Sequence, residues 1–447
     1  MIDKILRGDG ETIAIEYNET QITYRELEEQ VFLSCQKLDD IGVGRGSRVC
    51  LKAIEPVDYF VFLLACFTKG AVVCPLSDSY SDEYVHTILD IFQPDVVVLS
   101  EGKVELIEQQ ERHTPCSLQA MGLVTFTSGT TGVPKGVCHS VERLVKCAEV
   151  FNKHNNLSSN TKMMHVMPRF YMAGILNTFL SPLVAGGTVV LGNTFSAQNA
   201  PVLFKKYYDC KANTIWLSPS MLLLSSKMAR DPESVAWLSK SSSKVFVGTA
   251  PLPRNSKDFF QDKFSCEVLE SYGTSELLFI SCAQYGEGQE EGVGRLLDGV
   301  KMTFAPDDEI LIESPWAMLG YLNAKGNGRE SGDIGKLNNE KLLITGRKKD
   351  LIIKGGQNIS PRYIEEAALE YEGVDESAVV AGTHPFWGEV PILYVLPNDA
   401  YCEKSLRNLL GQKLSSDQLP EKIYTVKSFP KTVTGKIVKN SIVQECK

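Results

Sequence analysis

Several features that would mark particular protein classes are missing from this 447-residue sequence. No apolar run approaches the roughly 20 residues of a membrane-spanning helix, and the stretch 61–66 is far shorter. The first six residues have no long apolar core and no cleavage site, so we expect no signal peptide. No block of Lys and Arg offsets the net charge of −9, which argues against a general nucleic-acid-binding protein.

The cysteine pattern excludes two further classes. The twelve cysteines are scattered and never form C-x-x-C, which argues against a zinc site and against a disulfide-stabilised scaffold. We therefore expect buried, reduced thiols and a cytoplasmic protein. Cys138 lies near the most informative loop, but no neighbouring base would activate it, so we interpret it as a packing residue.

The chain is too long for one ordinary core, which predicts two or more domains. Short apolar strands alternate with helices over residues 10–120, and a second lobe of this kind follows a helix predicted at 141–153. This alternation is typical of βαβ units with mainly parallel sheets. Near residue 300 the pattern changes to hairpin strands, and residues 351–447 read as a compact α+β domain.

The stretch 124–136 reads VTFTSGTTGVPKG. A β-branched and aromatic strand end leads into a loop rich in hydroxyl groups and glycine, whose backbone N–H groups can converge on phosphate oxygens. Lys135 adds a positive charge at the far end. The common phosphate loop needs Lys directly after its second glycine, whereas Val133 and Pro134 intervene here and no helix should begin there.

This run resembles the nucleotide-phosphate loop of the adenylate-forming (ANL) enzymes, which include acyl- and aryl-CoA ligases, adenylation domains and firefly luciferase. Further blocks follow in the family's order. Tyr272-Gly273-Thr274-Ser275-Glu276 resembles Y-G-x-T-E, with Ser275 in place of Thr. Gly248-Thr249-Ala250-Pro251 resembles the start of G-G-A-P-L, with Thr249 in place of the second glycine. Ser331-Gly332-Asp333 resembles T-G-D, whose Asp binds the ribose hydroxyls.

The C-terminal blocks complete the resemblance. Gly346-Arg347-Lys348-Lys349-Asp350 resembles the family's hinge, with Lys349 at the pivot, and Gly355-Gly356 matches the loop beside the pantetheine channel. The run 430–437 resembles P-x-T-x-x-G-K, which makes Lys436 the adenylation lysine. The implied division is an N-terminal adenylation domain at 1–346, a hinge at 347–350 and a mobile C-terminal domain at 351–447. The stretch before residue 124 is shorter than in most relatives.

The resemblance implies a two-step reaction. A carboxylate attacks the α-phosphate of ATP–Mg²⁺, which gives an acyl-adenylate and pyrophosphate, and a thiol then displaces AMP. Lys436, Glu276 and Lys135 are the implied catalytic residues, and Glu276 is the implied Mg²⁺ ligand, in keeping with that ion's preference for oxygen. The implied ATP site consists of Thr127, Ser128, Gly129, Thr130, Thr131, Gly132, Lys135, Gly248, Thr249, Ala250, Pro251, Ser271, Tyr272, Gly273, Thr274, Ser275, Asp333 and Arg347.

The acid is harder to identify. Relatives that activate α-amino acids place an Asp near Phe170, whereas the run 167–174 here has no acidic residue, and an unpaired buried ammonium would be costly. The predicted pocket is mostly apolar and suits an aromatic or medium-length aliphatic acid; its residues are Tyr171, Met172, Ser218, Met221, Thr249 and Tyr272. His139, after the phosphate loop, is interpreted as structural.

Two alternatives remain open at this stage. The thiol could belong to free CoA or to the phosphopantetheine of a carrier protein, or the chain could be a binding protein that has lost turnover. The presence of Lys135, Glu276, Asp333 and Lys436 together argues against the last. The implied cofactors are ATP, Mg²⁺ and coenzyme A. We expect no nucleic acid partner, no membrane span, and a monomer or a homodimer.

Overall fold

We describe a computed structural model of the chain. The residues described are 1–52, 55–99, 104–106 (backbone only), 118–127, 133–240, 243–286, 292–326, 328–338, 340–432, 435–439 and 441–442. Most of the predicted phosphate loop lies outside them, namely Ser128, Gly129, Thr130, Thr131 and Gly132. Among the described residues, no helix is both long and apolar enough to cross a bilayer.

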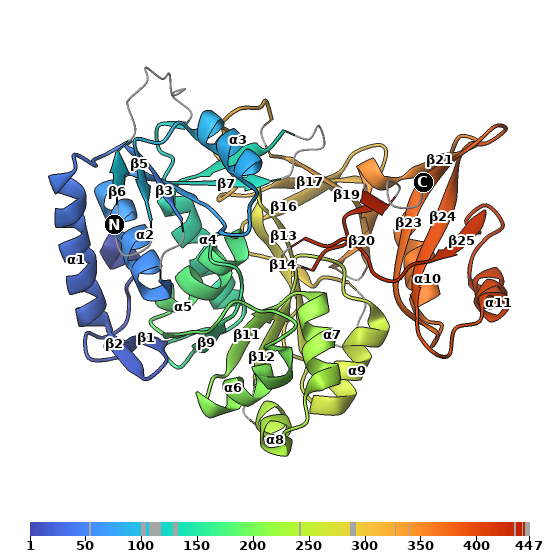
Figure 1. The fold of residues 1–447 in the computed structure, drawn as a ribbon, viewed down its shortest axis with the longest axis horizontal. Helices are drawn as coiled ribbons and strands as arrows, with labels where there is room; N and C mark the ends of the chain where they lie inside the picture. The colour runs from blue at the N-terminus through green and yellow to red at the C-terminus, as the bar shows by residue number, and fades with distance from the viewer. Residues whose placement is uncertain are drawn as a thin grey trace.

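One mainly parallel sheet dominates the middle of the molecule (Figure 1). Its strand order is β15-β14-β13-β12-β11-β9-β10-β1-β2, and the run from β13 to β1 is parallel throughout. The antiparallel additions lie at both edges. The strands are β1 (Ile13–Tyr17), β2 (Thr20–Thr23), β9 (Lys162–His165), β10 (Thr188–Leu191), β11 (Thr214–Leu217), β12 (Lys244–Val247), β13 (Val268–Thr274), β14 (Leu278–Cys282) and β15 (Arg295–Leu296).

A second sheet has the order β18-β8-β7-β4-β3-β5-β6, with parallel pairing from β7 to β5. Alternate residues of β3 face different cores: Val49 and Leu51 join the main hydrophobic cluster, and Cys50 joins another. This period of two is what a strand buried on both faces requires. The strands are β3 (Arg48–Leu51), β4 (Val72–Pro75), β5 (Val96–Val98), β6 (Val104–Leu106), β7 (Leu123–Thr127), β8 (Lys135–His139) and β18 (Gly320–Tyr321).

Helices link and cover these two sheets. Helix α1 begins at the predicted capping box, in which Thr23 and Glu26 each bond the other's backbone N–H. Helix α2 is buried along Tyr59–Phe67 and shares the main cluster with strands of both sheets. The helices are α1 (Tyr24–Asp40), α2 (Pro56–Lys69), α3 (Asp82–Phe92), α4 (Val141–His154), α5 (Ser181–Val184), α6 (Leu203–Asp209), α7 (Pro219–Met228), α8 (Pro232–Lys240), α9 (Arg254–Phe264) and a π-helix, Ala173–Leu180.

A smaller antiparallel sheet leads towards the C-terminal domain. Its order is β16 (Lys301–Phe304), β17 (Glu309–Glu313), β19 (Glu330–Asn338) and β20 (Lys341–Arg347). A 3₁₀ turn, Lys348–Asp350, follows β20 directly. This turn coincides with the predicted hinge.

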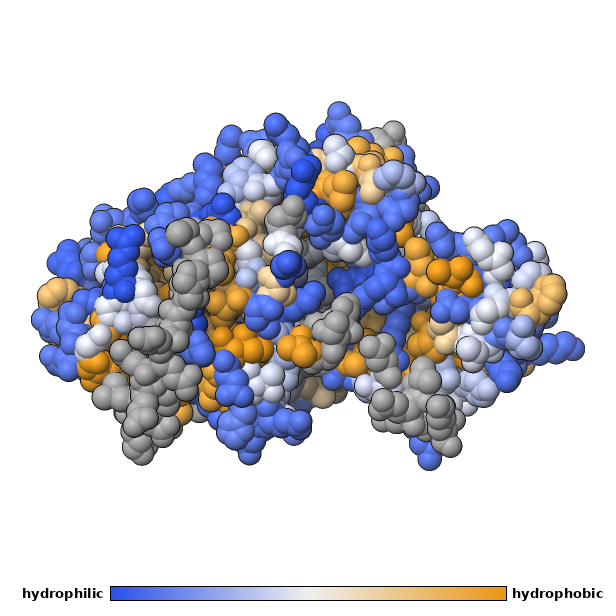
Figure 2. Space-filling view, turned by 90° about the horizontal axis from the view of Figure 1, so that it is seen from above, coloured by the Kyte–Doolittle hydropathy of each residue, from blue (hydrophilic) through white to orange (hydrophobic). Residues whose placement is uncertain are grey.

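The C-terminal domain projects from the larger part at the right of Figure 1. Its sheet has hydrophobic clusters of its own, one under the helices and one on the opposite face. In the view of Figure 2 the molecular surface is largely hydrophilic, with hydrophobic side chains interspersed. The elements are β21 (Ile352–Lys354), β22 (Gln357–Ile359), α10 (Pro361–Leu369), β23 (Val374–His384), β24 (Gly388–Pro397), α11 (Glu403–Lys413) and β25 (Lys422–Thr425).

The predicted fold class, an α/β protein with mainly parallel sheets and a small α+β domain, is confirmed. The boundaries 1–346, 347–350 and 351–447 stay a prediction. Among the described cysteines, all are free and most are buried, and burial raises the pKa of Cys138 to about 12, which fits a packing role. The sequence predicts a strand at 266–269 that ends in a loop at Ser271–Thr274, and this prediction is wrong, because Ser271–Thr274 is part of β13.

Candidate active site

Four neighbouring parallel strands bring the predicted acid-pocket residues together. Strands β9, β11, β12 and β13 lie side by side, so their carboxyl ends meet at one edge of the sheet. Each of the first three strands is followed by predicted residues, and β13 contains one itself. In strand order these residues are Tyr171 and Met172, Ser218 and Met221, Thr249, and Tyr272.

Two of these residues have defined local roles. Ser218 caps α7, because its hydroxyl accepts a hydrogen bond from the Met221 backbone N–H at 3.3 Å. Thr249 has a φ of +73°, in the left-handed region that a β-branched residue rarely adopts. A glycine at this position would adopt that φ without strain, whereas Thr249 is strained there. Gly248 before it is packed against Trp216 and the carbonyl of Ser271.

Asp333 is the centre of a buried polar cluster. The Tyr272 hydroxyl donates to its Oδ2 at 2.6 Å, and Arg347 Nε donates to its Oδ1 at 3.0 Å. Burial, with the Asp333 carboxylate adding to it, raises the pKa of Tyr272 far above its usual value, so the phenol stays protonated. Each carboxylate oxygen accepts about two hydrogen bonds, which leaves capacity on both oxygens for the paired hydroxyls of a ribose.

Glu276 lies at the turn between β13 and β14, and several neighbours hold that turn. The Tyr321 hydroxyl donates to Glu276 Oε1 at 3.0 Å, and the Met318 N–H donates to the Glu276 carbonyl at 2.7 Å. His139 Nε2 lies 2.7 Å from the Ser275 carbonyl. Burial lowers the pKa of His139 to about 4, so the ring is neutral and this contact requires Nε2–H as the donor. His139 therefore braces the turn, as its structural interpretation requires.

The strands on both sides of the phosphate loop are described. Thr127 at the end of β7 pairs with Lys135 at the start of β8, so the loop closes an antiparallel hairpin and no helix follows it. Lys135 Nζ lies 5.3 Å from the centre of the Tyr321 ring, and Tyr321 also contacts Glu276. The far end of the loop and the Glu276 turn are therefore neighbours.

The donor set at Glu276 fits Mg²⁺ bound mainly through a substrate. Among the residues that the structure describes, no three His, Cys, Asp or Glu side chains form a group that could hold a metal ion. Mg²⁺ in nucleotide sites commonly takes one or two protein carboxylates, completing its shell with phosphate oxygens and water. The carboxylate of Glu276, which shares the neighbour Tyr321 with Lys135, satisfies that requirement.

Lys436, in the C-terminal domain, lies within range of the charges of this cluster. Partial loss of hydration and the charges of Arg347 and Lys349 lower its pKa to about 8, although the side chain remains exposed at the edge of the cluster. Gly435, with a φ of +81°, packs so closely on α7 that a methyl group there would overlap the Ser220 hydroxyl. The structure thus brings Lys436 near Asp333, which lies about a hundred positions earlier in the chain.

The hinge cluster contains two adjacent lysines. Lys348 and Lys349 are both exposed, and Lys348 forms ion pairs with Asp307 at 2.6 Å and with Glu309 at 2.8 Å. Gly355 and Gly356, with φ of +57° and +88°, form the tight turn between β21 and β22. The turn alone accounts for both glycines, and β21 lies away from β13 in Figure 1, so their role at a pantetheine channel stays a prediction.

Sequence reasoning missed two contact residues. Tyr321 ends the run 316–321, which also resembles a block of the family, but only the fold shows that its side chain touches both Lys135 and Glu276. Ser220 has no sequence signal, because its importance comes from a glycine more than two hundred residues away.

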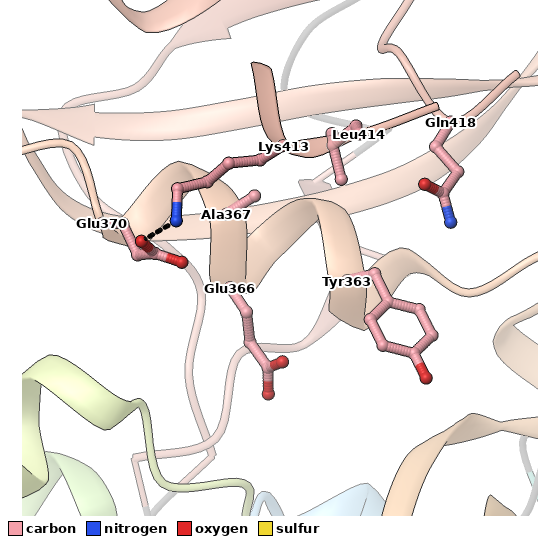
Figure 3. A pocket seen from close by; sticks show the side chains of 7 residues that line it. All are labelled: Tyr363, Glu366, Ala367, Glu370, Lys413, Leu414 and Gln418. Carbon is pink, nitrogen blue, oxygen red and sulfur yellow. Dashed lines mark hydrogen bonds and ion pairs between the residues drawn. The ribbon is translucent and has the colours of Figure 1, made fainter. Parts of the chain in front are cut away.

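A hollow of about 330 Å³ lies elsewhere, on the C-terminal domain between α10 and α11 (Figure 3). Its one lysine, Lys413, is already paired with Glu370. None of the predicted site residues lines it, and we assign it no part in the reaction. The lining residues are Tyr363, Glu366, Ala367, Glu370, Lys413, Leu414 and Gln418.

Comparison with known proteins agrees with this geometry. The chain is 26% identical to a 2-succinylbenzoate–CoA ligase of Bacillus cereus, over 96% of this chain and 95% of that protein. ATP-bound MatB of Rhodopseudomonas palustris has the same fold, with a TM-score of 0.85 and 22% identity over 98% of this chain and 96% of that one. So does o-succinylbenzoate CoA synthetase (MenE) of Bacillus subtilis bound to its acyl-adenylate intermediate, with a TM-score of 0.82 and 22% identity over 97% and 95%.

Two family models match in the order that the motifs predict. Residues 3–322 match the AMP-binding enzyme family, and residues 363–436 match the AMP-binding enzyme C-terminal domain. The first match alone covers more than half of the chain. The protein therefore belongs to the family of AMP-binding enzymes.

Proposed function

We propose that this protein is an AMP-forming acid–thiol ligase. It activates a carboxylic acid with ATP to an acyl-adenylate, then transfers the acyl group to the thiol of CoA and releases AMP. CoA takes part as a substrate, whereas the resemblance of the motifs implied that it is a cofactor. The ligase and synthetase relatives, which align with nearly the whole of this chain, support this proposal.

One observation carries the proposal: Gly435 of the C-terminal domain packs against Ser220 in α7 of the N-terminal part, which puts the neighbouring Lys436 within range of the charges of Arg347 and Asp333. In the first step Asp333 would hold the ribose and Arg347 the ribose or a phosphate. The loop residues would hold the phosphates, and Lys436 would offset negative charge that develops between carboxylate and α-phosphate. In the second step the C-terminal domain would turn about Lys349, withdraw Lys436 and bring Gly355-Gly356 to the thiol.

Magnesium belongs to the proposal as the ion that accompanies ATP. Glu276 would hold it, and it would lessen the charge on the phosphates. We also propose a cytoplasmic location, because ATP, CoA and reduced cysteines go together there. The oligomeric state, monomer or homodimer, can be measured by light scattering.

The acid that we propose is aromatic or medium aliphatic. The buried Met172 and Met221 and the half-buried Tyr171 supply apolar surface at the strand ends. The curated relative is named for 2-succinylbenzoate, an aryl acid, so that compound heads the panel to be tested.

The test is a screen of carboxylic acids by pyrophosphate release, followed by mass spectrometry of the products. With an accepted acid, ATP and CoA, we expect acyl-AMP first and then an acyl-CoA thioester. Transfer only to the phosphopantetheine of a carrier protein would favour the alternative acceptor. Failure to bind ATP, or binding of ATP without adenylate formation across the panel, would overturn the proposed function.

A further inference from the structure

We infer that Tyr321 is a positioning residue that sets Lys135 and Glu276 relative to each other for binding of Mg²⁺·ATP. This inference rests on the proposed function and names a residue with no role assigned above. Tyr321 comes from β18, at the edge of the second sheet, whereas Glu276 lies in the turn between β13 and β14 of the first sheet. Tyr321 therefore links the part of the proposed ATP site that comes from the second sheet to the part that comes from the first.

The backbone around Tyr321 is tied to the strand that leaves the phosphate loop. Residues Gly320 and Tyr321 pair with Cys138 and Val137 in β8. The Asn323 side chain then donates to the Pro134 carbonyl at 2.8 Å and accepts from the Gly136 N–H at 3.1 Å. Since these bonds lie on both sides of Lys135, the strand and the Tyr321 segment should move as one unit.

The same segment is tied to the Glu276 turn at its other end. The Met318 N–H donates to the Glu276 carbonyl at 2.7 Å, three residues before Tyr321. Arg143 in α4 donates to the Met318 carbonyl at 2.9 Å and so attaches the segment to that helix. The backbone on both sides of Lys135 and the backbone of Glu276 are thus hydrogen-bonded to the same short stretch of chain, residues 318–323.

The Tyr321 side chain completes the link. Its hydroxyl donates to Glu276 Oε1 at 3.0 Å, and its ring faces the Lys135 ammonium at 5.3 Å from the ring centre. A hydrogen bond to one carboxylate oxygen leaves the other, Oε2, for the metal ion. The aromatic face holds the ammonium without neutralising it, as a carboxylate would, so Lys135 keeps its charge for a phosphate.

Two substitutions separate the hydroxyl from the ring. Tyr321→Phe removes only the bond to Glu276, and Tyr321→Leu removes the ring as well. Binding of ATP without acid is measured by titration calorimetry, with excess Mg²⁺ and with EDTA, so turnover plays no part. Tyr285→Phe is the matched control, because Tyr285 is an exposed tyrosine with 68% of its surface accessible.

With Mg²⁺ we expect Tyr321→Phe to weaken ATP binding about tenfold, as expected for a lost hydrogen bond to a charged group. With EDTA the same variant should bind ATP as the unaltered protein does. Tyr321→Leu should lose about a further threefold, and this additional loss should persist in EDTA because it arises at Lys135. In a Glu276→Gln background, Tyr321→Phe should have almost no further effect.

Equal or tighter Mg²⁺·ATP binding by Tyr321→Phe would overturn the inference, as would an equal loss with and without Mg²⁺. A lowered melting temperature with proportionate loss in both conditions would mark a purely structural role and overturn it too. Failure of the unaltered protein to bind Mg²⁺·ATP would instead overturn the proposed function. The two failures are therefore distinguishable.

Discussion

The Glu276 turn and the Lys436 loop both belong to the proposed active site, but they are attached differently. The turn lies within a sheet and is braced by His139, Met318 and Tyr321, all from the N-terminal part. The Lys436 loop belongs to a domain with its own hydrophobic clusters. That domain meets α7 and α9 partly through exposed polar contacts, such as Lys227 with Asp375 and Asn255 with the Leu369 carbonyl.

The difference in attachment matches a difference in task. Lys227 and Asp375 are 50% and 40% exposed, and an ion pair of this kind contributes about 0–1 kcal/mol. An interface with such contacts can open and close at little cost, which suits a domain that must serve two steps. The Glu276 side must keep its geometry in the first step, so many neighbours hold it. Substitutions on the two sides should therefore have different signatures.

Replacing the mobile lysine should have the largest effect. Lys436→Ala removes the positive charge delivered to the reacting phosphate, so we expect adenylation to fall about 10²- to 10³-fold. Thioester formation from a supplied acyl-adenylate should be spared, because we propose that Lys436 is withdrawn in that step. Pyrophosphate release and thioester formation are measured separately, with Lys422→Ala, an exposed lysine in β25, as the control. Equal loss in both steps would refute the role.

A substitution at the contact between the Lys436 loop and α7 should have the next largest effect. Gly435→Ala puts a methyl group against the Ser220 hydroxyl and forces alanine to a φ of +81°. Because the strain alone costs about 1–2 kcal/mol, we expect adenylation to fall about 10- to 100-fold while the thioester step is retained. Gly411→Ala is the matched control, since a methyl group there meets no atom within 4 Å. Loss of the thioester step would show that the loop serves both states.

The sequence predicts these two sides unequally. The motifs around Glu276, Asp333 and Lys436 carry local signals, and the alternation of strands and helices predicts the parallel sheets. What the motifs leave open is how they meet: Tyr272 and Asp333 are 61 positions apart, and their side chains come from strands of two different sheets. The strand β13 also continues through Gly273 past a bulge, where glycine would predict a loop.

The pH dependence of adenylation should give a third way to distinguish the Lys436 loop from the Glu276 turn. Lys436 has its pKa lowered to about 8, and the protonated amine is the form that offsets charge. Adenylation should therefore be constant below pH 8 on this account and fall as the pH rises through 8. Lys349→Met removes a neighbouring positive charge, which raises the pKa and moves this limb upwards by about half a pH unit.

The matched control for the titration is Lys422→Met, which removes a positive charge from an exposed position in β25. The thioester step should show no such limb in any variant. A limb that stays in place in Lys349→Met would mean that another group titrates there.

The smallest effect should come from relieving the backbone strain at Thr249, in the N-terminal part. Thr249 holds a φ of +73°, which costs about 1–2 kcal/mol in a residue with a Cβ. Thr249→Gly removes that strain but makes the unfolded chain more flexible, so we expect a net gain of at most about 1 kcal/mol in the free energy of unfolding. Calorimetry should show a rise of about 1–3 °C in the melting temperature of the N-terminal part. Thr249→Ala keeps the Cβ and its strain, so an equal rise in that variant would assign the effect to the side chain rather than to the backbone.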